Sequence, residues 1–324
     1  MFLDEYKYDS RLPDVEGPNG AQLNFEVRAA YLFARDQITS ASWHWLKYHF
    51  STYPFHSMAI EIARHCACIE SFIPGAGRKL IESIASRKNR EKNEDDYQGI
   101  LQDMSEVLVI MQIVNIPWPE ETAFFYEPAG SNGKRPEVQV STVGGNYLFE
   151  VKAPSLLNHQ RDRQRNATQL PTRGLFPLEH IDELVDQGGL TKPRDNPVKD
   201  FLLSADEKFA GFDRSKGGNL LVIVWDDFIY EPISSLVSDV SGLLTVESWL
   251  KDENDEAVVF PNIDGVIVVR HLNYFAEALA DRPLPDRRDG FDCGQAGALP
   301  NVFFPTRWGH KIPSFIPSAF RAVD

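Results

Sequence analysis

The sequence predicts an α/β protein with a mixed β-sheet flanked by helices, preceded by a helical module. Apolar residues recur at helical spacing through much of residues 22–84. An amphipathic helix at 97–116 is followed by short strand patterns that turn residues separate. Two near-continuous apolar runs, at 219–225 and 263–269, are typical of strands buried on both faces of a sheet. Together these patterns predict the element order α-β-β-β-α-β, with one further strand.

The length and composition are those of an ordinary globular protein. The chain has 324 residues, of which 43% are hydrophobic and 25% are charged. This length suffices for one large domain or two smaller ones. We expect a helical N-terminal module at 1–94, an α/β core at 95–275, and a Pro-rich C-terminal segment at 276–324 that wraps the surface.

The helical module begins after a polar stretch. Residues 1–20 are rich in Pro, Gly and Asp, which predicts a loose arm. A helix is expected at 58–72, where the Pro74-Gly75 dipeptide closes it. Residues 78–98 are highly charged, so we expect a helix end and an exposed connector there. This connector sets the predicted boundary between the helical module and the core.

The first half of the core is predicted to be one helix and a three-strand meander. The helix at 97–116 stops before a proline. Asn132-Gly133 marks a tight turn because both residues tolerate positive φ, and Gly144-Gly145 marks the next turn. We therefore expect three strands, at 123–127, 137–142 and 147–153.

The second half of the core begins with an insertion at 155–196, which is polar and interrupted by prolines. A helix at 197–209 follows, with proline in its first turn. The two apolar strands at 219–225 and 263–269 then complete the sheet. Beyond residue 273 the chain carries six prolines, so we expect this segment to cover the surface with little regular structure.

The predicted strand at 147–153 carries the candidate chemistry. Side chains alternate between faces along a strand, so Glu150 and Lys152 point the same way while their apolar neighbours point to the other face. Glu137, on the preceding strand, can bring a second carboxylate to the same sheet edge. Two carboxylates and a lysine can bind a hard divalent cation and activate a water beside a phosphodiester. The alternative is a weak ion pair on the solvent face of an edge strand.

The spacing of these residues resembles that of the PD-(D/E)xK nuclease superfamily. Pro136-Glu137 is followed, after twelve residues, by Glu150-Val151-Lys152. The resemblance covers roughly residues 95–270 and implies a restriction-endonuclease-like core with the order α-β-β-β-α-β. It also implies a deoxyribonuclease that depends on Mg²⁺ or Mn²⁺, with DNA as the expected substrate.

The resemblance further implies roles for individual residues. Glu137 and Glu150 would bind the metal ion, together with the backbone carbonyl of Val151. Lys152 would orient the attacking water and offset negative charge in the transition state. Members of this superfamily most often have Asp at the first acidic position, so Glu127 remains an alternative to Glu137 as the first ligand.

Two helical positions complete the implied site. Superfamily members often carry a further acid on the helix before the sheet, and Glu106 is the best match here, with Asp103 as the second choice. The helix before the fourth strand often carries a Gln or Lys that faces the site, and Lys208 occupies that place. The alternative for both acids is an exposed position on the helix.

The net charge of −14 argues against a surface built for non-specific DNA binding. Basic residues gather at 78–92 and 161–173, which are the candidate phosphate-contacting segments, with solvated faces as the alternative. We therefore expect local recognition of the nucleic acid or delivery by a partner protein, and a homodimer is also compatible. The second hypothesis is a nuclease-like fold without catalysis that binds nucleic acid or protein.

Cellular location follows from what the sequence lacks. No apolar run is long enough to span a bilayer, and the first residues lack the pattern of a secretory signal. Three cysteines, with Cys66 and Cys68 close together, argue against a disulfide framework. We expect a cytoplasmic, reduced protein with no membrane partner.

Overall fold

The computed structural model describes residues 21–52, 56–165, 168–170, 173, 183–185, 187, 190–213, 216–284, 287–294 and 301–323. The predicted loose arm at 1–20 lies outside the described residues, as does part of the predicted insertion at 155–196. The chain divides into two compact units. The helical unit takes Met1–Trp118, Phe124–Tyr126 and His271–Leu299, and the sheet unit takes Pro119–Ala123, Glu127–Arg270 and Pro300–Asp324.

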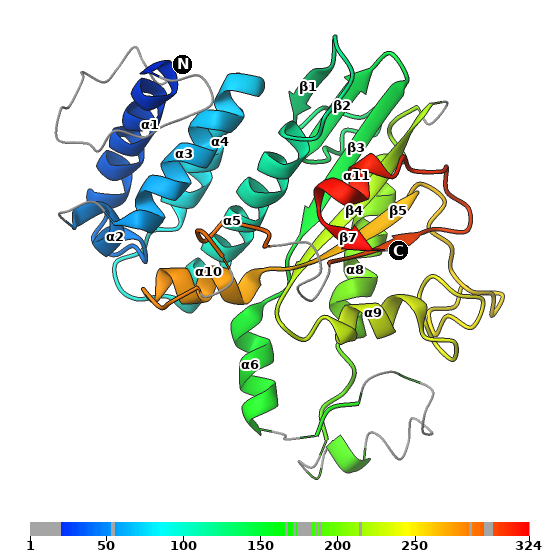
Figure 1. The fold of residues 1–324 in the computed structure, drawn as a ribbon. Helices are drawn as coiled ribbons and strands as arrows, with labels where there is room; N and C mark the ends of the chain where they lie inside the picture. Colours follow the sequence, from blue (N-terminus) through cyan, green and yellow to red (C-terminus); the bar gives the residue numbers. More distant parts are fainter. Residues whose placement is uncertain are drawn as a thin grey trace. The chain divides into compact units, whose positions relative to one another are not determined.

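The helical unit is drawn mostly in blue and cyan in Figure 1. Its helices are α1 (Ala21–Thr39), α2 (Lys47–Ser51), α3 (Ser57–Phe72), α4 (Ala76–Ser86), α5 (Glu94–Val114) and α10 (Leu272–Leu279). Helix α3 packs against α1, α4 and α5. Asn93 caps α5, since its side chain accepts a hydrogen bond from the Asp95 amide at 2.9 Å. None of the described helices is both long and apolar enough to cross a membrane.

Helix α5 belongs to the helical unit, whereas the sequence analysis placed its residues in the core that begins at 95. The apolar spacing predicted a helix with one apolar side. In the structure Ile100, Leu101, Val109 and Ile110 are all buried, so apolar side chains surround much of the helix. Because α5 packs against α3, α4 and α10, its contacts move the boundary of the helical unit beyond Val114.

A mixed sheet flanked by helices makes the second unit an α/β fold (Figure 1). Among the described residues the sheet has seven strands, which follow one another across it in chain order. They are β1 (Ala123–Tyr126), β2 (Val138–Thr142), β3 (Gly145–Lys152), β4 (Gly217–Trp225), β5 (Gly265–Arg270), β6 (Asn301–Pro305) and β7 (Ala322–Val323). All of them belong to the sheet unit except residues Phe124–Tyr126 of β1, which are grouped with the helical unit. The helices of this unit are α6 (Leu156–Arg165), α8 (Asp195–Phe209), α9 (Tyr230–Val237) and α11 (Phe315–Ala319).

Both pairing modes occur in the sheet. Strands β2–β3 and β5–β6 pair antiparallel, whereas β3–β4, β4–β5 and β6–β7 pair parallel. One sheet face packs against α8, where Leu148, Leu221 and Val266 form a buried cluster with Leu202 and Phe209 of that helix. Strand β4 is buried along nearly its whole length, as its continuous apolar sequence predicts. The parallel centre of the sheet therefore provides a rigid base for side chains on β3.

The turn between β1 and β2 has the backbone conformation that its Asn-Gly sequence predicts. Gly133 has φ of +76°, the left-handed value that the Asn-Gly turn requires. The Asn132 side chain accepts a hydrogen bond from the Lys134 amide at 3.0 Å and donates one to the Glu207 carbonyl at 2.7 Å. This turn is therefore fixed to the end of α8 as well as to its own backbone.

The C-terminal segment is more regular than the sequence analysis predicts. Strand β6 pairs with β5, and β7 pairs with β6, so this segment extends the sheet. Its prolines are compatible with this, since Pro305 ends β6 and Pro317 lies in the short helix α11. The Asn301 side-chain amide donates to the Phe320 carbonyl at 2.6 Å and joins β6 to the end of α11. The prediction of a wrap with little regular structure over 276–324 was therefore wrong.

Candidate active site

Strand β3 presents Glu150 and Lys152 on one sheet face, in line with the alternation of side chains along a strand. The Lys152 Nζ lies 2.7 Å from the Glu150 Oε1. Strand β3 is an interior strand, paired with β2 on one side and with β4 on the other. The register sets Glu150 level with Leu221 and Lys152 level with Ile223 of β4. Glu150 therefore lies on an interior strand and not on an edge strand.

Helix α8 adds a second ammonium group to this pair. Lys208, in the last turn of α8, places its Nζ 2.6 Å from the Glu150 Oε1 and 2.8 Å from the Oε2. The same Nζ lies 3.4 Å from the Glu137 Oε1. Glu137 precedes β2 and is held beside β3 because its N–H donates to the Phe149 carbonyl at 3.0 Å. Two carboxylates and two ammonium groups thus converge from three parts of the chain.

Burial distinguishes this cluster from an ordinary surface ion pair. The Glu150 side chain is 0% exposed, and those of Glu137, Lys208 and Lys152 are 15%, 21% and 24% exposed. The interpretation of Glu150 and Lys152 as a solvent-facing pair on an edge strand was therefore wrong. The side chains of Glu137, Lys208 and Lys152 keep partial contact with solvent. A small ion can therefore reach the cluster from solvent.

The electrostatic environment shifts the pKa values of two groups in the cluster. Burial and the nearby Glu137 carboxylate raise the pKa of Glu150, while Lys152 and Lys208 act against this shift. Burial acts to lower the pKa of Lys208, but the carboxylates of Glu137 and Glu150 outweigh it and raise that pKa. Lys208 is therefore an ammonium at neutral pH and acts as a fixed positive charge, not as a base. The enclosed Glu150 Oε1 lies within ion-pair distance of both amines but lacks a hydrogen bond of good geometry.

The two carboxylates fit a hard divalent cation on one condition. Mg²⁺ usually binds through one or two carboxylates, with water and substrate oxygens as the other ligands. Glu137 and Glu150 both reach one point, which the Lys208 ammonium occupies. A metal ion held by both acids therefore requires the Lys208 side chain to move aside. Among the described residues, no group of three His, Cys, Asp or Glu side chains is placed to hold a metal ion.

The remaining predicted ligands lie close to the cluster along the chain. Val151 follows Glu150 in β3, so its side chain points to the opposite sheet face, and the role of its carbonyl stays a prediction. The Glu127 N–H donates to the Glu137 carbonyl at 2.9 Å, and Glu127 has φ of +48°. The contact of the Glu137 carboxylate with Lys208 favours Glu137 as the first acid.

The two acids predicted on the preceding helix belong to the other unit of the chain. Glu106 and Asp103 are on α5, which belongs to the helical unit and not to the unit that carries Glu150. Asp103 is buried and forms a two-point ion pair with Arg87, at 2.9 and 3.0 Å, which raises the pKa of Arg87. Glu106 lies 3.4 Å from the Tyr126 hydroxyl. Asp103 is thus committed to an internal ion pair, and Glu106 as a third acid stays a prediction.

Basic residues of the two candidate phosphate-contacting segments are paired with acids. Within 78–92, Arg78 lies 3.1 Å from Glu82, and Arg87 binds Asp103 as described above. Within 161–173, Arg163 and Arg173 each lie 2.5 Å from a buried acid. These contacts favour a structural role for the four arginines over phosphate binding.

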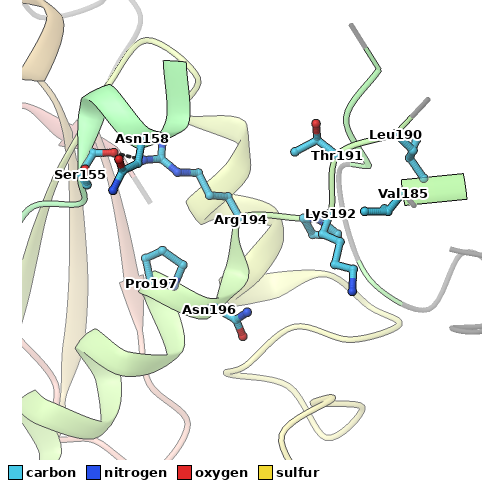
Figure 2. A pocket seen from close by; sticks show the side chains of 10 residues that line it. Ser155, Asn158, Val185, Leu190, Thr191, Lys192, Arg194, Asn196 and Pro197 are labelled. Carbon is cyan, nitrogen blue, oxygen red and sulfur yellow. Dashed lines mark hydrogen bonds between the residues drawn. The ribbon is translucent and has the colours of Figure 1, made fainter. Parts of the chain in front are cut away.

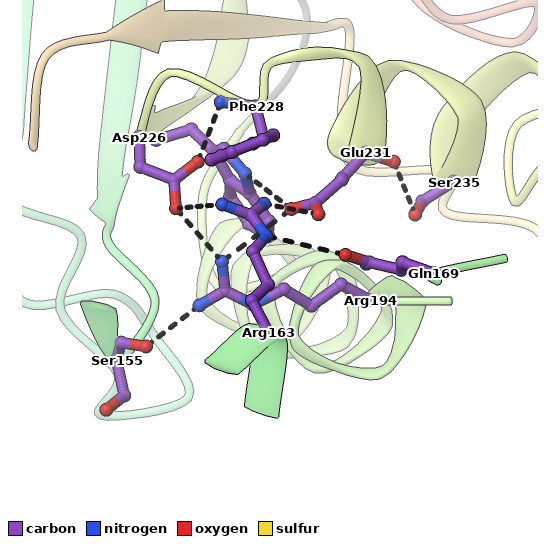
Figure 3. Close-up of polar contacts among 9 residues, drawn as sticks. Ser155, Arg163, Gln169, Arg194, Asp226, Phe228, Glu231 and Ser235 are labelled. Carbon is purple, nitrogen blue, oxygen red and sulfur yellow. Dashed lines mark hydrogen bonds and ion pairs between the residues drawn. The ribbon is translucent and has the colours of Figure 1, made fainter. Parts of the chain in front are cut away.

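A second charged cluster lies at the carboxyl ends of β3 and β4, and the sequence analysis missed it (Figure 3). Asp226 directly follows β4, and Glu231 lies in the first turn of α9; both are buried. The Arg163 Nη2 lies 2.5 Å from the Glu231 Oε1, and the Arg194 Nη1 lies 3.4 Å from the Asp226 Oδ2. Burial lowers the pKa of Arg194 to about 10, although the two acids act against this shift.

One signal for this cluster was present in the sequence. Asp226 follows an apolar strand directly, and polar side chains at the carboxyl ends of parallel strands often gather at functional sites. Arg163 lies in the basic segment 161–173, but nothing in the sequence pairs it or Arg194 with Asp226, because both lie far from Asp226 along the chain. Only the fold brings the four charges together.

Comparisons with protein families, with curated proteins and with solved structures gave no match for this chain. The functional interpretation therefore depends on the residues themselves and on the contacts that the fold gives them.

Proposed function

We propose that this protein is a Mg²⁺-dependent nuclease that hydrolyses phosphodiester bonds, with DNA as its expected substrate. On this proposal the sheet unit is a restriction-endonuclease-like core of the PD-(D/E)xK superfamily. The observation that carries the proposal is the convergence of Glu137, Glu150 and Lys152 beside Lys208. Carboxyl groups with perturbed pKa values often lie at functional sites, and the raised pKa of Glu150 therefore supports a catalytic role for this cluster.

Each side chain has a distinct role in the proposed reaction. Glu137 and Glu150 hold the cation, which requires Glu150 to be ionised although burial raises its pKa. Lys152, the most exposed of the four, donates a hydrogen bond to the attacking water and offsets charge on the phosphate oxygens. Lys208 neutralises Glu150 when no metal ion is bound. A bound Mg²⁺ supplies a water of lowered pKa and stabilises the developing negative charge.

One observation favours the second candidate, a nuclease-like binding module without catalysis. The Lys208 ammonium already forms ion pairs with both carboxylates, at 2.6 Å from Glu150 and 3.4 Å from Glu137. A cluster of two acids and two lysines is electrically balanced, so it has less need of a metal ion than two acids and one lysine. The two candidates therefore differ in whether a divalent cation displaces Lys208.

Cleavage assays with the purified full chain test the proposal. Supercoiled, linear and single-stranded DNA, and RNA, are incubated with Mg²⁺, with Mn²⁺ or with a chelator. We expect metal-dependent cleavage that falls by about 100-fold or more in Glu150→Gln and in Lys152→Ala, the range seen when a transition-state contact is removed. Because Glu150 must be ionised, the cleavage rate should rise with pH through the raised pKa of Glu150.

A matched surface variant controls for non-specific effects. Lys134 is an exposed lysine of the same unit, paired with the exposed Glu207 at 3.2 Å, so Lys134→Ala should cleave like the wild-type chain. Thermal unfolding with added Mg²⁺ separates the two candidates. A metal-dependent rise in Tm that is lost in Glu150→Gln supports the nuclease. No cleavage on any substrate and no effect of metal on Tm would refute it in favour of the binding module.

A further inference from the structure

The Lys208 ammonium bridges the two carboxylates of the proposed metal site. Its Nζ lies 2.6 Å from the Glu150 Oε1, 2.8 Å from the Glu150 Oε2 and 3.4 Å from the Glu137 Oε1. The Lys152 Nζ lies 2.7 Å from the Glu150 Oε1, and among the described contacts it forms no ion pair with Glu137. The two lysines therefore differ: Lys208 joins both acids, whereas Lys152 contacts one of them.

The contacts with these amines leave one oxygen of Glu150 without a well-directed hydrogen bond. The Oε1 atom is enclosed and lies within ion-pair distance of both amines, yet it has no hydrogen-bond partner of good geometry among the described residues. A buried polar atom of this kind is uncommon in folded proteins. Carboxylate oxygens are the ligands that a hard divalent cation prefers. The enclosed oxygen is therefore suited to a cation that takes the place of the Lys208 ammonium.

The backbone of α8 is held at both ends, so the exchange must come from the Lys208 side chain. At the start of α8, the Arg194 Nη2 donates to the Ser155 carbonyl at 2.8 Å, beside a cavity that both residues line (Figure 2). At its end, the Glu207 carbonyl accepts a hydrogen bond from the Asn132 side chain at 2.7 Å. The Lys208 side chain is 21% exposed, and its four-carbon stem is flexible. Its ammonium can therefore turn toward solvent while the helix stays in place.

The charges of the cluster determine when Lys208 leaves the two acids. Two carboxylates and two ammonium groups balance each other, so a divalent cation by itself gives the site an excess of two positive charges. Repulsion from the two ammonium groups at this short range opposes the binding of that cation. A phosphodiester beside the site adds negative charge and offers the Lys208 ammonium a new hydrogen-bond acceptor. The cation and the phosphate should therefore bind together more readily than the cation alone.

We propose that Lys208 keeps the metal site closed until a phosphate of the substrate gives its ammonium another partner, so that the divalent cation and the nucleic acid bind cooperatively. This inference rests on the proposed nuclease function and concerns the regulation of that same site. Coupling between two ligands is reciprocal, so the cation strengthens binding of the nucleic acid by the factor by which the nucleic acid strengthens binding of the cation. Without substrate, the site then binds free metal ions only weakly.

Isothermal titration of Mn²⁺ into the full chain, without nucleic acid, tests whether Lys208 closes the site. We expect Lys208→Met to bind Mn²⁺ about tenfold more tightly than the wild-type chain, or more, which is within the usual range for coupled binding. Lys208→Gln removes the same charge and keeps a polar side chain, so it should show the same gain. Lys152→Met removes an equal charge but not the bridge between the acids, and its gain should be clearly smaller. The exposed Lys134→Met should bind Mn²⁺ like the wild-type chain, and Glu150→Gln should lose binding.

The coupling to nucleic acid is measured by fluorescence anisotropy at constant ionic strength. The probes are short fluorescein-labelled DNAs, duplex and single-stranded, with phosphorothioate linkages that resist cleavage. Mn²⁺ in place of a chelator should lower the Kd of the wild-type chain for DNA by about tenfold. In Lys208→Met this factor should be smaller, because the cation has no ammonium to displace.

Three results would overturn the role of Lys208, and they differ in what they leave standing. Equal Mn²⁺ affinity in the wild-type chain and in both Lys208 variants would show that Lys208 does not close the site, while the nuclease proposal stands. Equal gains in Lys208→Met and Lys152→Met would show that charge alone, and not the bridging position, weakens metal binding. If no variant binds Mn²⁺, with or without DNA, the nuclease proposal itself fails and this inference fails with it.

Discussion

Replacing Lys208 with methionine tests how the buried Glu150 carboxylate is stabilised. Methionine keeps a long unbranched side chain in the last turn of α8 but removes the charge that lies 2.6 Å from the Glu150 Oε1. The only other ammonium in the described cluster is that of Lys152, at 2.7 Å from the same oxygen. The substitution therefore leaves a fully buried carboxylate with half of its positive partners.

The expected loss of stability follows from the geometry. Removing one partner of a buried ion pair typically costs ~3–5 kcal/mol. Lys152 still balances Glu150, and the Lys208 side chain is 21% exposed, so at pH 8 we expect a smaller loss of about 2 kcal/mol. For a unit of this size that loss corresponds to a fall in Tm of about 4–8 °C.

The pH dependence of this loss is the sharper part of the prediction. The pKa of Glu150 is raised in the fold from its ordinary value of 4.5, so the folded chain binds this proton more tightly than the unfolded chain does. The stability that this group contributes therefore falls as the pH rises from about 4.5 through the raised pKa. Loss of Lys208 raises that pKa further and extends the window upward. The cost of Lys208→Met should thus be clearly larger at pH 8 than at pH 5, where Glu150 can take up a proton.

Thermal unfolding followed by circular dichroism at pH 5 and pH 8 measures both values. Lys134→Met serves as the control, because its ion pair with Glu207 is exposed and worth at most about 1 kcal/mol. In a Glu150→Gln background, Lys208→Met should cost little at either pH, since the buried charge is gone. An equal loss at both pH values, or a loss no larger than that of the control, would show that Lys208 does not hold the Glu150 charge.

Two further substitutions test the packing of each unit. A Cβ at Gly77 of α4 would collide with the Cys66 carbonyl of α3, so Gly77→Ala should cost ~1–3 kcal/mol in urea unfolding. Gly144→Ala, at an open turn position, should change little, and equal effects would contradict the close approach. Arg163→Met removes the 2.5 Å partner of the buried Glu231, and we expect a loss of ~3 kcal/mol. Unchanged thermal stability would show that the second cluster does not hold α6.

The parts of the fold that the sequence predicts are those set by local patterns. The apolar run of β4 fixes a strand buried on both faces, and the turn at Gly133 follows from its dipeptide with Asn132. The period of two along β3 was enough to place Glu150 and Lys152 on one face. The place of Lys208 was predicted only through the resemblance, because its meeting with Glu150 depends on how α8 packs on the sheet.

Other features depend on contacts between distant segments, which no local pattern specifies. Strand β6 is short and ends in Pro305, so its sequence resembles that of a loop. It forms a strand because it pairs with β5. The apolar residues of α5 predicted the helix correctly, but they did not indicate the unit to which the helix belongs. Arg163 and Arg194 of the insertion form ion pairs with Glu231 and Asp226. These acids come only after α8 and β4 in the chain. The burial of Asp226 and Glu231, and not their spacing in the sequence, determines that these two arginines pair with them.

The insertion links the Glu137–Glu150 cluster to the second charged cluster, because it joins β3 to α8. It leaves β3 just after Lys152 and returns to α8, which carries Lys208 at its far end. Arg194, the last residue before α8, is fixed to the Ser155 carbonyl and to Asp226 at the carboxyl ends of β3 and β4. Those contacts hold the start of α8 against the sheet, and a rigid helix transmits that position to Lys208. Loosening the Arg194 contacts should therefore weaken the Glu150–Lys208 pair as well as the second charged cluster.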